Sequence, residues 1–284
     1  MIPEPRVVEG LAWREAGPED APPVLLLHGF PTSSLLWRGF FPALAPQLRL
    51  IAPDLFGGGA SAAPDDASVA GQAAALTRLL DRLGVSRTAI VAHGHGGAIA
   101  RTVAATRDVP TLVLLDAPDD PVAWPDAVDG AVDGADVGLG IVEVLRAGLG
   151  HPERVPVDVV EAYAAPFVAD PDRFRRAVGA LAAPSGAASA PTPDIPTLLL
   201  WGEDDAYVPV AVAEAMAEAI PGATLGVLPG CGHFLPEDAS DALVPLVLEY
   251  LRGRYLGIVH RHEPGPVEVF LGRRPPAEAE RMDT

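Results

Sequence analysis

The chain has 284 residues, of which 49% are hydrophobic and 20% charged, a composition typical of soluble globular proteins. Its net charge of −18 argues against nucleic-acid and anionic-membrane partners, because phosphate binding needs clustered cations. The single cysteine, Cys231, excludes an intrachain disulfide. The sequence lacks the basic and apolar regions of a signal peptide and any apolar run of membrane-spanning length, so we expect a cytoplasmic protein. The expected partner is a small molecule, and the sequence leaves the oligomeric state open.

The first part of the chain alternates short apolar strands with a helix. Residues 6–17 alternate loosely between apolar and polar types, which favours a hairpin at a sheet edge. Residues 23–28 and 48–53 are short apolar runs, typical of strands that a parallel sheet buries on both faces. Apolar residues then recur at helical spacing over 67–83, and Gly84 is a usual signal for the end of a helix.

The stretch from Thr88 to Arg101 combines an apolar strand, a glycine-rich turn and an Ala-rich helix. This layout is that of a nucleophile elbow, in which a G-x-S-x-G-like turn presents a nucleophile above a sheet. The turn reads Ala92-His-Gly-His-Gly-Gly97, so the nucleophile's position holds Gly94, which has no side chain. The next apolar run, residues 111–116, predicts another buried strand.

Residues 117–195 interrupt the alternation of strands and helices. Asp, Pro, Ala and Gly dominate, and helical spacing predicts helices near 139–149, 157–168 and 171–182. A Pro/Ser/Ala/Gly linker over 183–193 closes the segment. We therefore interpret residues 117–195 as a helical cap inserted into the main domain.

The strand pattern resumes after the cap. The predicted elements are a strand at 196–201, a helix at 209–220, a strand at 223–228 and a helix at 239–252. Strands that alternate with helices imply an α/β fold, with a mostly parallel sheet and helices on both faces. The predicted core comprises residues 1–116 and 196–252, with the cap above the carboxyl ends of the strands, where open α/β sheets bind ligands. Residues 253–284 are expected to form a partly disordered extension with a possible strand at 267–271.

Five motifs in the core resemble a known family. They are His28-Gly-Phe-Pro31, Pro53-Asp-Leu-Phe-Gly-Gly-Gly-Ala-Ser61, the turn around Gly94, Gly202-Glu-Asp-Asp205 and Gly230-Cys-Gly-His-Phe-Leu-Pro-Glu237. In this order, each at a predicted strand end, they resemble motifs of the α/β-hydrolase superfamily, in its branch of epoxide hydrolases and haloalkane dehalogenases. The residues that follow the first motif, as far as Arg38, are also similar to those of dehalogenases. The resemblance covers residues 7–116 and 196–252 and implies the α/β-hydrolase fold.

The resemblance also implies a catalytic dyad and an oxyanion hole. His233 would be the general base, and Asp205 would bind its far imidazole nitrogen, which fixes the tautomer and stabilises the imidazolium. The backbone N–H groups of Phe30 and His95 would hold an anion, and neither depends on the identity of its side chain.

Gly94 is the departure from the family pattern. Without a side chain there, no acyl- or alkyl-enzyme can form at that position. Glycine also relieves the strain of an elbow turn, so a degenerated enzyme is one interpretation and an enzyme that needs no nucleophile is another. The otherwise intact motifs favour the second. Dehalogenases carry a halide-holding Trp where this chain has His95, whereas a histidine there resembles the G-H-S-H-G of cofactor-free dioxygenases, which deprotonate their substrates with a His/Asp dyad.

Other residues could in principle take part in the chemistry. Asp204 is expected to be solvated, and Asp116, at another strand end, is a reserve acid. Cys231 is expected to be a buried structural thiol, and Ser33 and Ser34 are expected to cap the following helix.

Two further ligand sites are weaker interpretations. A metal site formed by His93, His95 and His233 would lack a carboxylate or cysteine at ligand spacing, so no metal is expected. The glycines at 57–59 do not form a phosphate loop, because no Gly-Lys-Ser/Thr follows, and Asp54 is expected to organise this loop.

The sequence thus predicts an enzyme in which His233 and Asp205 deprotonate an activated, largely apolar small molecule while backbone donors hold the anion. Lyase, cyclase, C–C bond-forming and cofactor-free oxygenase chemistry all fit, and no cofactor is expected. Two alternatives stay open: a hydrolase of an ester, lactone or epoxide that uses His-activated water, and a non-catalytic ligand-binding protein. The residues expected to contact the substrate are His28, Trp37, His95, Trp124, Tyr163 and Phe234.

Overall fold

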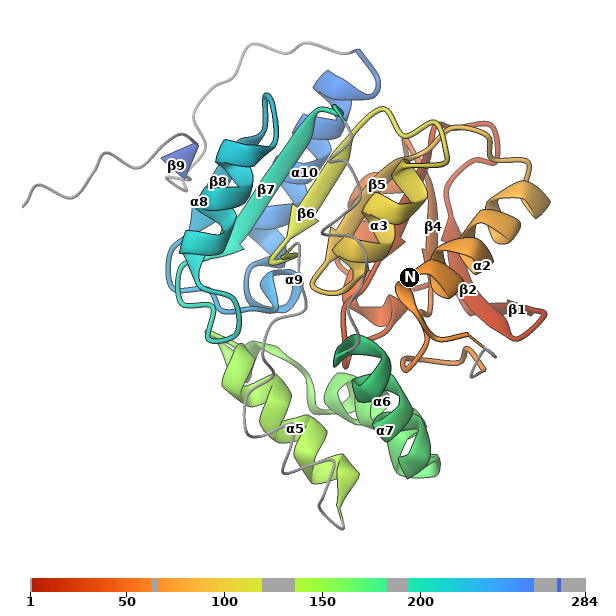
Figure 1. Ribbon diagram of the computed structural model, residues 1–284, viewed down its shortest axis with the longest axis vertical. Helices are drawn as coiled ribbons and strands as arrows, with labels where there is room; N and C mark the ends of the chain where they lie inside the picture. Colours follow the sequence, from red (N-terminus) through yellow and green to blue (C-terminus); the bar gives the residue numbers. More distant parts are fainter. Residues whose placement is uncertain (1, 63–65, 119–135, 183–193, 258–269, 272–284) are drawn as a thin grey trace, which may run out of the picture.

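The computed structural model describes residues 2–62, 66–118, 136–182, 194–257 and 270–271. The strands of this described part form one sheet in the order β1-β2-β4-β3-β5-β6-β7-β8-β9 (Figure 1). They are β1 (Arg6–Val8), β2 (Leu11–Ala16), β3 (Pro23–Leu27), β4 (Arg49–Pro53), β5 (Ala89–His93), β6 (Leu112–Leu115), β7 (Thr197–Gly202), β8 (Thr224–Leu228) and β9 (Phe270–Leu271). Strands β3 to β8 are parallel to one another, whereas the pairs β1–β2, β2–β4 and β8–β9 are antiparallel.

Helices cover both faces of the sheet, so the predicted α/β fold is confirmed. The helices of the core are η1 (Ser34–Trp37), α1 (Phe40–Leu44), α2 (Val69–Arg82), α3 (Gly96–Ala104), α8 (Val210–Ala219), α9 (Leu235–Asp238) and α10 (Ser240–Arg254). Helices α2, α3 and α8 contribute to the hydrophobic cluster on one face, and α1 and α10 contribute to the cluster on the other.

The strands are apolar throughout because both of their faces are covered. In β3, Leu25 and Leu27 join the cluster of α2, α3 and α8, while Val24 and Leu26 join the cluster of α1 and α10. All four side chains are fully buried. The two-residue alternation of a strand therefore divides one apolar run between two cores, as expected for a parallel sheet between helices.

The two edges of the sheet carry the antiparallel strands. The hairpin predicted at residues 6–17 is confirmed, and its two-residue turn, Glu9 and Gly10, has φ of 52° and 80°. Positive φ at both positions is what a type I′ turn requires, and this turn matches the twist of the flanking strands. At the other edge, β9 overlaps the strand predicted at 267–271, of which residues 267–269 lie outside the described residues.

Three helices between β6 and β7 lie beside the carboxyl ends of these strands (Figure 1). They are α5 (Val137–Gly148), α6 (Val157–Ala169) and α7 (Pro171–Ala182), with the short η2 (Pro152–Arg154) between α5 and α6. We call α5, α6 and α7 the cap helices. Helix α5 begins two residues earlier than predicted, because the Asp136 side chain accepts a hydrogen bond from the backbone N–H of Leu139 (2.9 Å) and caps the helix there.

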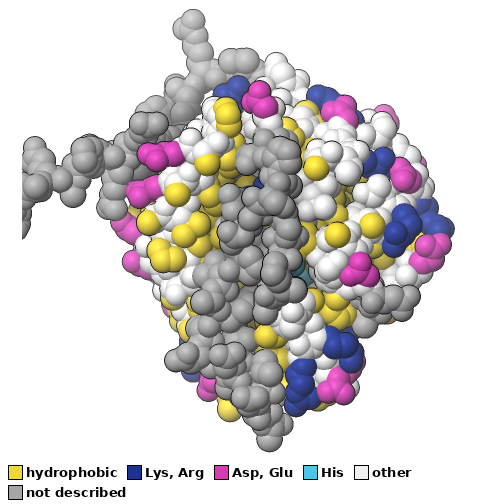
Figure 2. Space-filling model, viewed as in Figure 1, with side chains coloured by type: hydrophobic (Ala, Val, Ile, Leu, Met, Phe, Trp, Pro, Cys, Tyr) yellow, Lys and Arg dark blue, Asp and Glu magenta, His cyan; other side chains and the backbone are white. Residues whose placement is uncertain are grey.

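Charged side chains of both signs lie close together in two regions of the surface. On the face shown in Figure 2, arginines lie beside acidic residues over α2 and the β1–β2 hairpin and over the cap helices. Arg82 pairs with Glu9 in the first region, and Arg176 pairs with Asp170 in the second (2.9 Å). Within the described residues, no helix is both long and apolar enough to cross a bilayer.

Candidate active site

The turn between β5 and α3 brings the backbone close to a histidine on a distant loop. Gly94 has φ of +52°, a left-handed conformation that side chains disfavour, and its N–H bonds to the carbonyl of Leu115 in β6 (3.0 Å). A Cβ added at Gly94 would lie 3.4 Å from His233 Nε2 and 3.6 Å from the Cα of Gly29. These are ordinary contact distances, so the space beside Nε2 has room for a small group.

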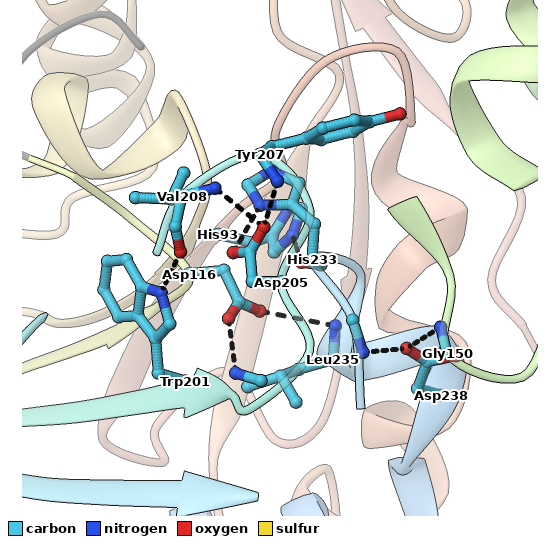
Figure 3. A network of polar contacts seen from close by, with 12 residues as sticks. His93, Asp116, Gly150, Trp201, Asp205, Tyr207, Val208, His233, Leu235 and Asp238 are labelled. Atoms are coloured by element: carbon cyan, nitrogen blue, oxygen red, sulfur yellow. Dashed lines mark hydrogen bonds and ion pairs between the residues drawn. The ribbon is translucent and has the colours of Figure 1, made fainter. Parts of the chain in front are cut away.

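His233 and Asp205 form a buried pair at the carboxyl end of the sheet (Figure 3). His233 Nδ1 lies 2.9 Å from one carboxylate oxygen of Asp205. The other oxygen accepts hydrogen bonds from the backbone N–H groups of Tyr207 (2.8 Å) and Val208 (2.9 Å). The carboxylate is therefore fixed, its partner Nδ1 carries the ring proton, and Nε2 presents its lone pair toward Gly94.

The neighbouring acids take different positions. Asp204 is exposed at the surface, whereas Asp205 is 9% exposed. Asp116, the reserve acid, is fully buried, and its carboxyl group accepts hydrogen bonds from the N–H of Gly202 (2.8 Å) and of Leu235 (3.4 Å). Burial raises its pKa well above the ordinary value, and the nearby charge of Asp205 adds to this effect. Asp116 thus links the end of β7 to the residues that follow His233.

Burial keeps the other histidines around the turn neutral. Burial and the proximity of His233 lower the pKa of His93 to about 3, and its Nε2 lies 2.8 Å from the backbone carbonyl of His233, to which it donates. The pKa of His95 is lowered to about 4, by burial first and then by His28. Near the turn, His233 is the only histidine of the described residues that lies within ion-pair distance of a carboxylate. It is therefore the histidine equipped to take up a proton.

Acid should destabilise the fold through His93. Its pKa lies near 3 in the folded chain against an ordinary value of 6.5, so between these values the unfolded state binds a proton that the folded state does not. Stability is therefore lost as the pH falls through this window, by about 1.4 kcal/mol per pH unit for this one group. Urea unfolding between pH 7 and pH 5 measures the loss. His93→Gln, which retains an N–H for the carbonyl of His233, should remove this part of the slope, and an unchanged slope would contradict the assignment.

Two residues assigned to the substrate site occupy other places, and these assignments are corrected. His28 is buried, with Nε2 accepting the N–H of Leu55 (2.8 Å) and Nδ1 lying 2.9 Å from the carbonyl of Gly29, so its ring fixes the loop after β4. Trp37 is fully buried in the cluster of α1 and α10 and packs edge-on against Phe40 (5.0 Å between centroids). Helix η1 thus places Trp37 inside the hydrophobic core on that face of the sheet, where no substrate reaches it.

The remaining predicted contact residues divide between the dyad and the cap. Phe234 packs edge-on against the ring of His233, with centroids 5.1 Å apart. Tyr163 on α6 is buried, and its hydroxyl donates to Glu237 Oε1 (2.5 Å). His95 is partly exposed at the start of α3. Trp124 lies outside the described residues.

Phe30 joins the loop after β3 to the cap. Its ring packs against Phe167 of α6 (5.6 Å) and Phe174 of α7 (5.5 Å), which also pack on each other (5.7 Å). The backbone N–H of His95 precedes α3, whose positive dipole end lies at this turn. The residues that precede the two named backbone donors lie side by side, because a Cβ at Gly94 would be 3.6 Å from the Cα of Gly29.

The glycines at 57–59 have a structural role that the sequence did not reveal. Gly57 has φ of +91°, and an added Cβ would lie 2.7 Å from the Cβ of Ala177 on α7, so glycine permits close approach of the cap. Arg173 of α7 donates to the carbonyls of Gly58 (2.9 Å), Gly59 (3.2 Å) and Ser61 (2.7 Å). This loop is therefore a docking surface for the cap.

The serines and the cysteine considered above serve the structure. Ser33 caps η1 by accepting the N–H of Leu35 (3.3 Å), as predicted, whereas the Ser34 hydroxyl accepts a hydrogen bond from Arg14 (3.0 Å). Cys231 is buried, and burial raises the pKa of its thiol to about 11. A protonated, enclosed thiol is a poor nucleophile.

Sequence reasoning missed Tyr207 and Asp238, which contact the loop of His233, and Arg38, which joins the core to the cap through Glu237 and Tyr163. The Tyr207 ring packs against His233 (5.2 Å), and its hydroxyl donates to the carbonyl of Val144 in α5. Arg38 forms a two-pronged ion pair with Glu237. Their partners are far away in sequence, so no local pattern signals these contacts.

Comparison with known proteins identifies the family. The model of the α/β hydrolase fold family matches residues 22–134 and 162–240. The chain belongs to this family. This α/β hydrolase is 30% identical to a haloalkane dehalogenase of Bradyrhizobium diazoefficiens, over 88% of its own length and 93% of the relative's. It is also 30% identical to the magnesium-chelatase 30 kDa subunit of Rhodobacter capsulatus, over 84% and 90%.

A solved structure agrees with this assignment. An α/β hydrolase fold protein from Burkholderia ambifaria matches with a TM-score of 0.76 and 30% identity, covering 87% of this chain and 97% of that one. The similarity therefore extends over most of this chain and most of each relative.

Proposed function

We propose that this α/β hydrolase is a general-base enzyme that acts on an activated, neutral small molecule without a covalent intermediate. The observation that carries the proposal is the position of His233 Nε2, which lies 3.4 Å from where a side chain would begin at Gly94. The base is held by Asp205, and the nucleophile's position beside it is occupied by Gly94, which has no side chain. A proton donor that occupies this space meets Nε2 directly.

The proposed chemistry has two parts. His233 Nε2 removes a proton from an acidic C–H or O–H group of the substrate, and the Asp205 carboxylate at 2.9 Å stabilises the imidazolium that forms. The backbone N–H groups of Phe30 and His95 hold the resulting anion. General-base catalysis contributes about 10²- to 10⁴-fold and one oxyanion donor about 10²- to 10³-fold. Rate enhancements of this size are sufficient for an activated substrate. Lyase, cyclase, C–C bond-forming and cofactor-free oxygenase reactions all begin with such a proton abstraction.

The surroundings of the dyad support a neutral, apolar substrate. Phe234 and Tyr207 pack on His233, and Phe167 and Phe174 cover Phe30 from the cap. His28, His93 and His95 all have lowered pKa values because of burial, so they add no positive charge to bind an anion.

Hydrolysis by a His-activated water is the second candidate. The space at Gly94 is limited by His233 Nε2 and Gly29, and a water there would contact Nε2. Membership of the α/β hydrolase family supports this reaction for an ester, lactone or epoxide. Substrate turnover in ¹⁸O-labelled water distinguishes the two, because hydrolysis places the label in the product and proton abstraction does not.

The decisive experiment is metabolite profiling of the source strain after deletion of the gene, with complementation by wild type or by His233→Ala. We expect only wild type to restore the profile, since the alanine variant lacks the base, and the accumulated compound is then the substrate candidate. Equal restoration by His233→Ala would instead establish a ligand-binding role without catalysis.

A further inference from the structure

The loop that carries the general base is held between the sheet and the cap. We call residues Gly230–Phe234 the base loop. The backbone N–H of His233 donates to the carbonyl of Gly148, the last residue of α5 (2.7 Å). A Cβ at Gly232 would clash with that same carbonyl, and a Cβ at Gly202, the last residue of β7, would clash with the carbonyl of Gly232. The base is therefore packed, backbone against backbone, between the ends of β7 and α5.

One buried carboxylate joins the base loop to the cap. Asp238 is 1% exposed, and its Oδ2 accepts the N–H of Gly232 (2.8 Å) and of Gly150 (2.9 Å). Its Oδ1 accepts the N–H of His151 (2.8 Å), and Arg154 donates to its backbone carbonyl (2.5 Å). Figure 3 shows the carboxylate directed at this junction, below the dyad. Three amides from two separate segments thus converge on one side chain.

The charge of Asp238 is what this arrangement requires. A buried carboxylate is stable only where several donors replace its water, and three backbone amides do so here. An asparagine of the same shape would direct its NH₂ group at one oxygen position, so at least one of the three amides would lose its acceptor. The proposed chemistry takes no proton from Asp238, so the role of this carboxylate is to hold the backbone rather than to react.

We propose that Asp238 is a positioning residue for the general base. Its carboxylate holds the base loop against the segment that follows α5, and this contact fixes the position of His233 Nε2 relative to the cap. This inference rests on the proposed function, because it assigns Asp238 a role in placing Nε2. The adjacent Glu237 is a matched control. It is 6% exposed and also binds the cap through Tyr163, but its side chain bonds to Arg38 and Tyr163 and to no residue of the base loop.

The first test measures alignment without a known substrate. Gly94→Ser places a hydroxyl beside Nε2, and its rate of reaction with a fluorophosphonate probe reports the position of His233. Adding Asp238→Asn should slow labelling about ten- to 100-fold, because small displacements of a catalytic group have effects of this size. Adding Glu237→Gln should leave the rate within about twofold. Equal rates for the Gly94→Ser protein with and without Asp238→Asn would overturn the inference.

The second test does not depend on catalysis or on the serine. Residue-resolved hydrogen exchange of otherwise wild-type protein should show faster exchange at Gly232, His233, Gly150 and His151 together in Asp238→Asn. Glu237→Gln should leave these amides unchanged. Unchanged exchange in Asp238→Asn would also overturn the inference. If exchange changes as expected but Gly94→Ser is not labelled, the coupling of cap and base loop stands and the proposed function fails.

Discussion

Gly94→Ser is expected to react with a fluorophosphonate probe, whereas the wild-type protein is not. The new Cβ would lie 3.4 Å from His233 Nε2, so the hydroxyl one bond further out reaches hydrogen-bond distance of the base. His233 would take the serine proton while Oγ displaces fluoride from phosphorus. The φ of +52° costs a residue with a side chain about 1–3 kcal/mol, which a folded domain of this size tolerates. Intact-mass spectrometry detects the adduct.

Two controls accompany this experiment. Gly94→Ala adds the same Cβ and the same backbone strain without a hydroxyl, so it should remain unlabelled. Gly94→Ser combined with His233→Ala should lose most of the labelling, because the serine is no longer activated. Labelling of wild type would reveal a nucleophile elsewhere in the chain and would refute the central proposal. A folded Gly94→Ser protein that does not react would show that the base and the backbone donors are not aligned.

Asp205→Asn should abolish most of the function of the dyad. One oxygen of Asp205 accepts two backbone amides, from Tyr207 and Val208, so an asparagine keeps its carbonyl there and turns its NH₂ toward His233. This NH₂ group would donate to Nδ1 and force the ring proton onto Nε2, which could then accept no proton. We expect a loss of about 10³- to 10⁴-fold, as for other oriented histidines that lose their carboxylate.

The labelling rate of Gly94→Ser provides the assay until the substrate is known. Asp204→Asn is the matched control, because Asp204 is adjacent in sequence but exposed and should leave the rate unchanged. A small effect of Asp205→Asn, comparable to that of Asp204→Asn, would show that the Asp205 carboxylate does not orient the base.

The fold was predictable because its signals are local. Each buried strand is a short apolar run, and each longer helix shows regular apolar spacing. Polar turns, or a glycine such as Gly84 after α2, separate these elements. The start of α5 was misplaced by two residues because Asp136 acts as its cap, and Asp is common enough in this segment that the sequence does not single it out.

The site was predictable only where a strand end fixes a residue's place. Asp205 and His233 follow β7 and β8, so parallel strands bring them to one edge of the sheet. Trp37 also follows a strand, but η1 rotates its side chain into the opposite core. The contacts of Asp238 with Gly150 and His151 join residues more than eighty positions apart, and they depend on how the segment after α5 packs against the end of the sheet. Short-range sequence patterns do not predict this packing between distant segments.

The aromatic contacts of Phe30 limit how the cap of this α/β hydrolase could be exchanged for another. Phe30 follows Gly29, which lies beside Gly94, and its ring packs on Phe167 and Phe174 of the cap. A chimera that receives the cap of another family member therefore needs matching rings at those two positions, or its β3 loop will settle elsewhere. Transplanting the cap would for this reason also change the packing of the β3 loop, and the loop and the cap should be exchanged as one unit.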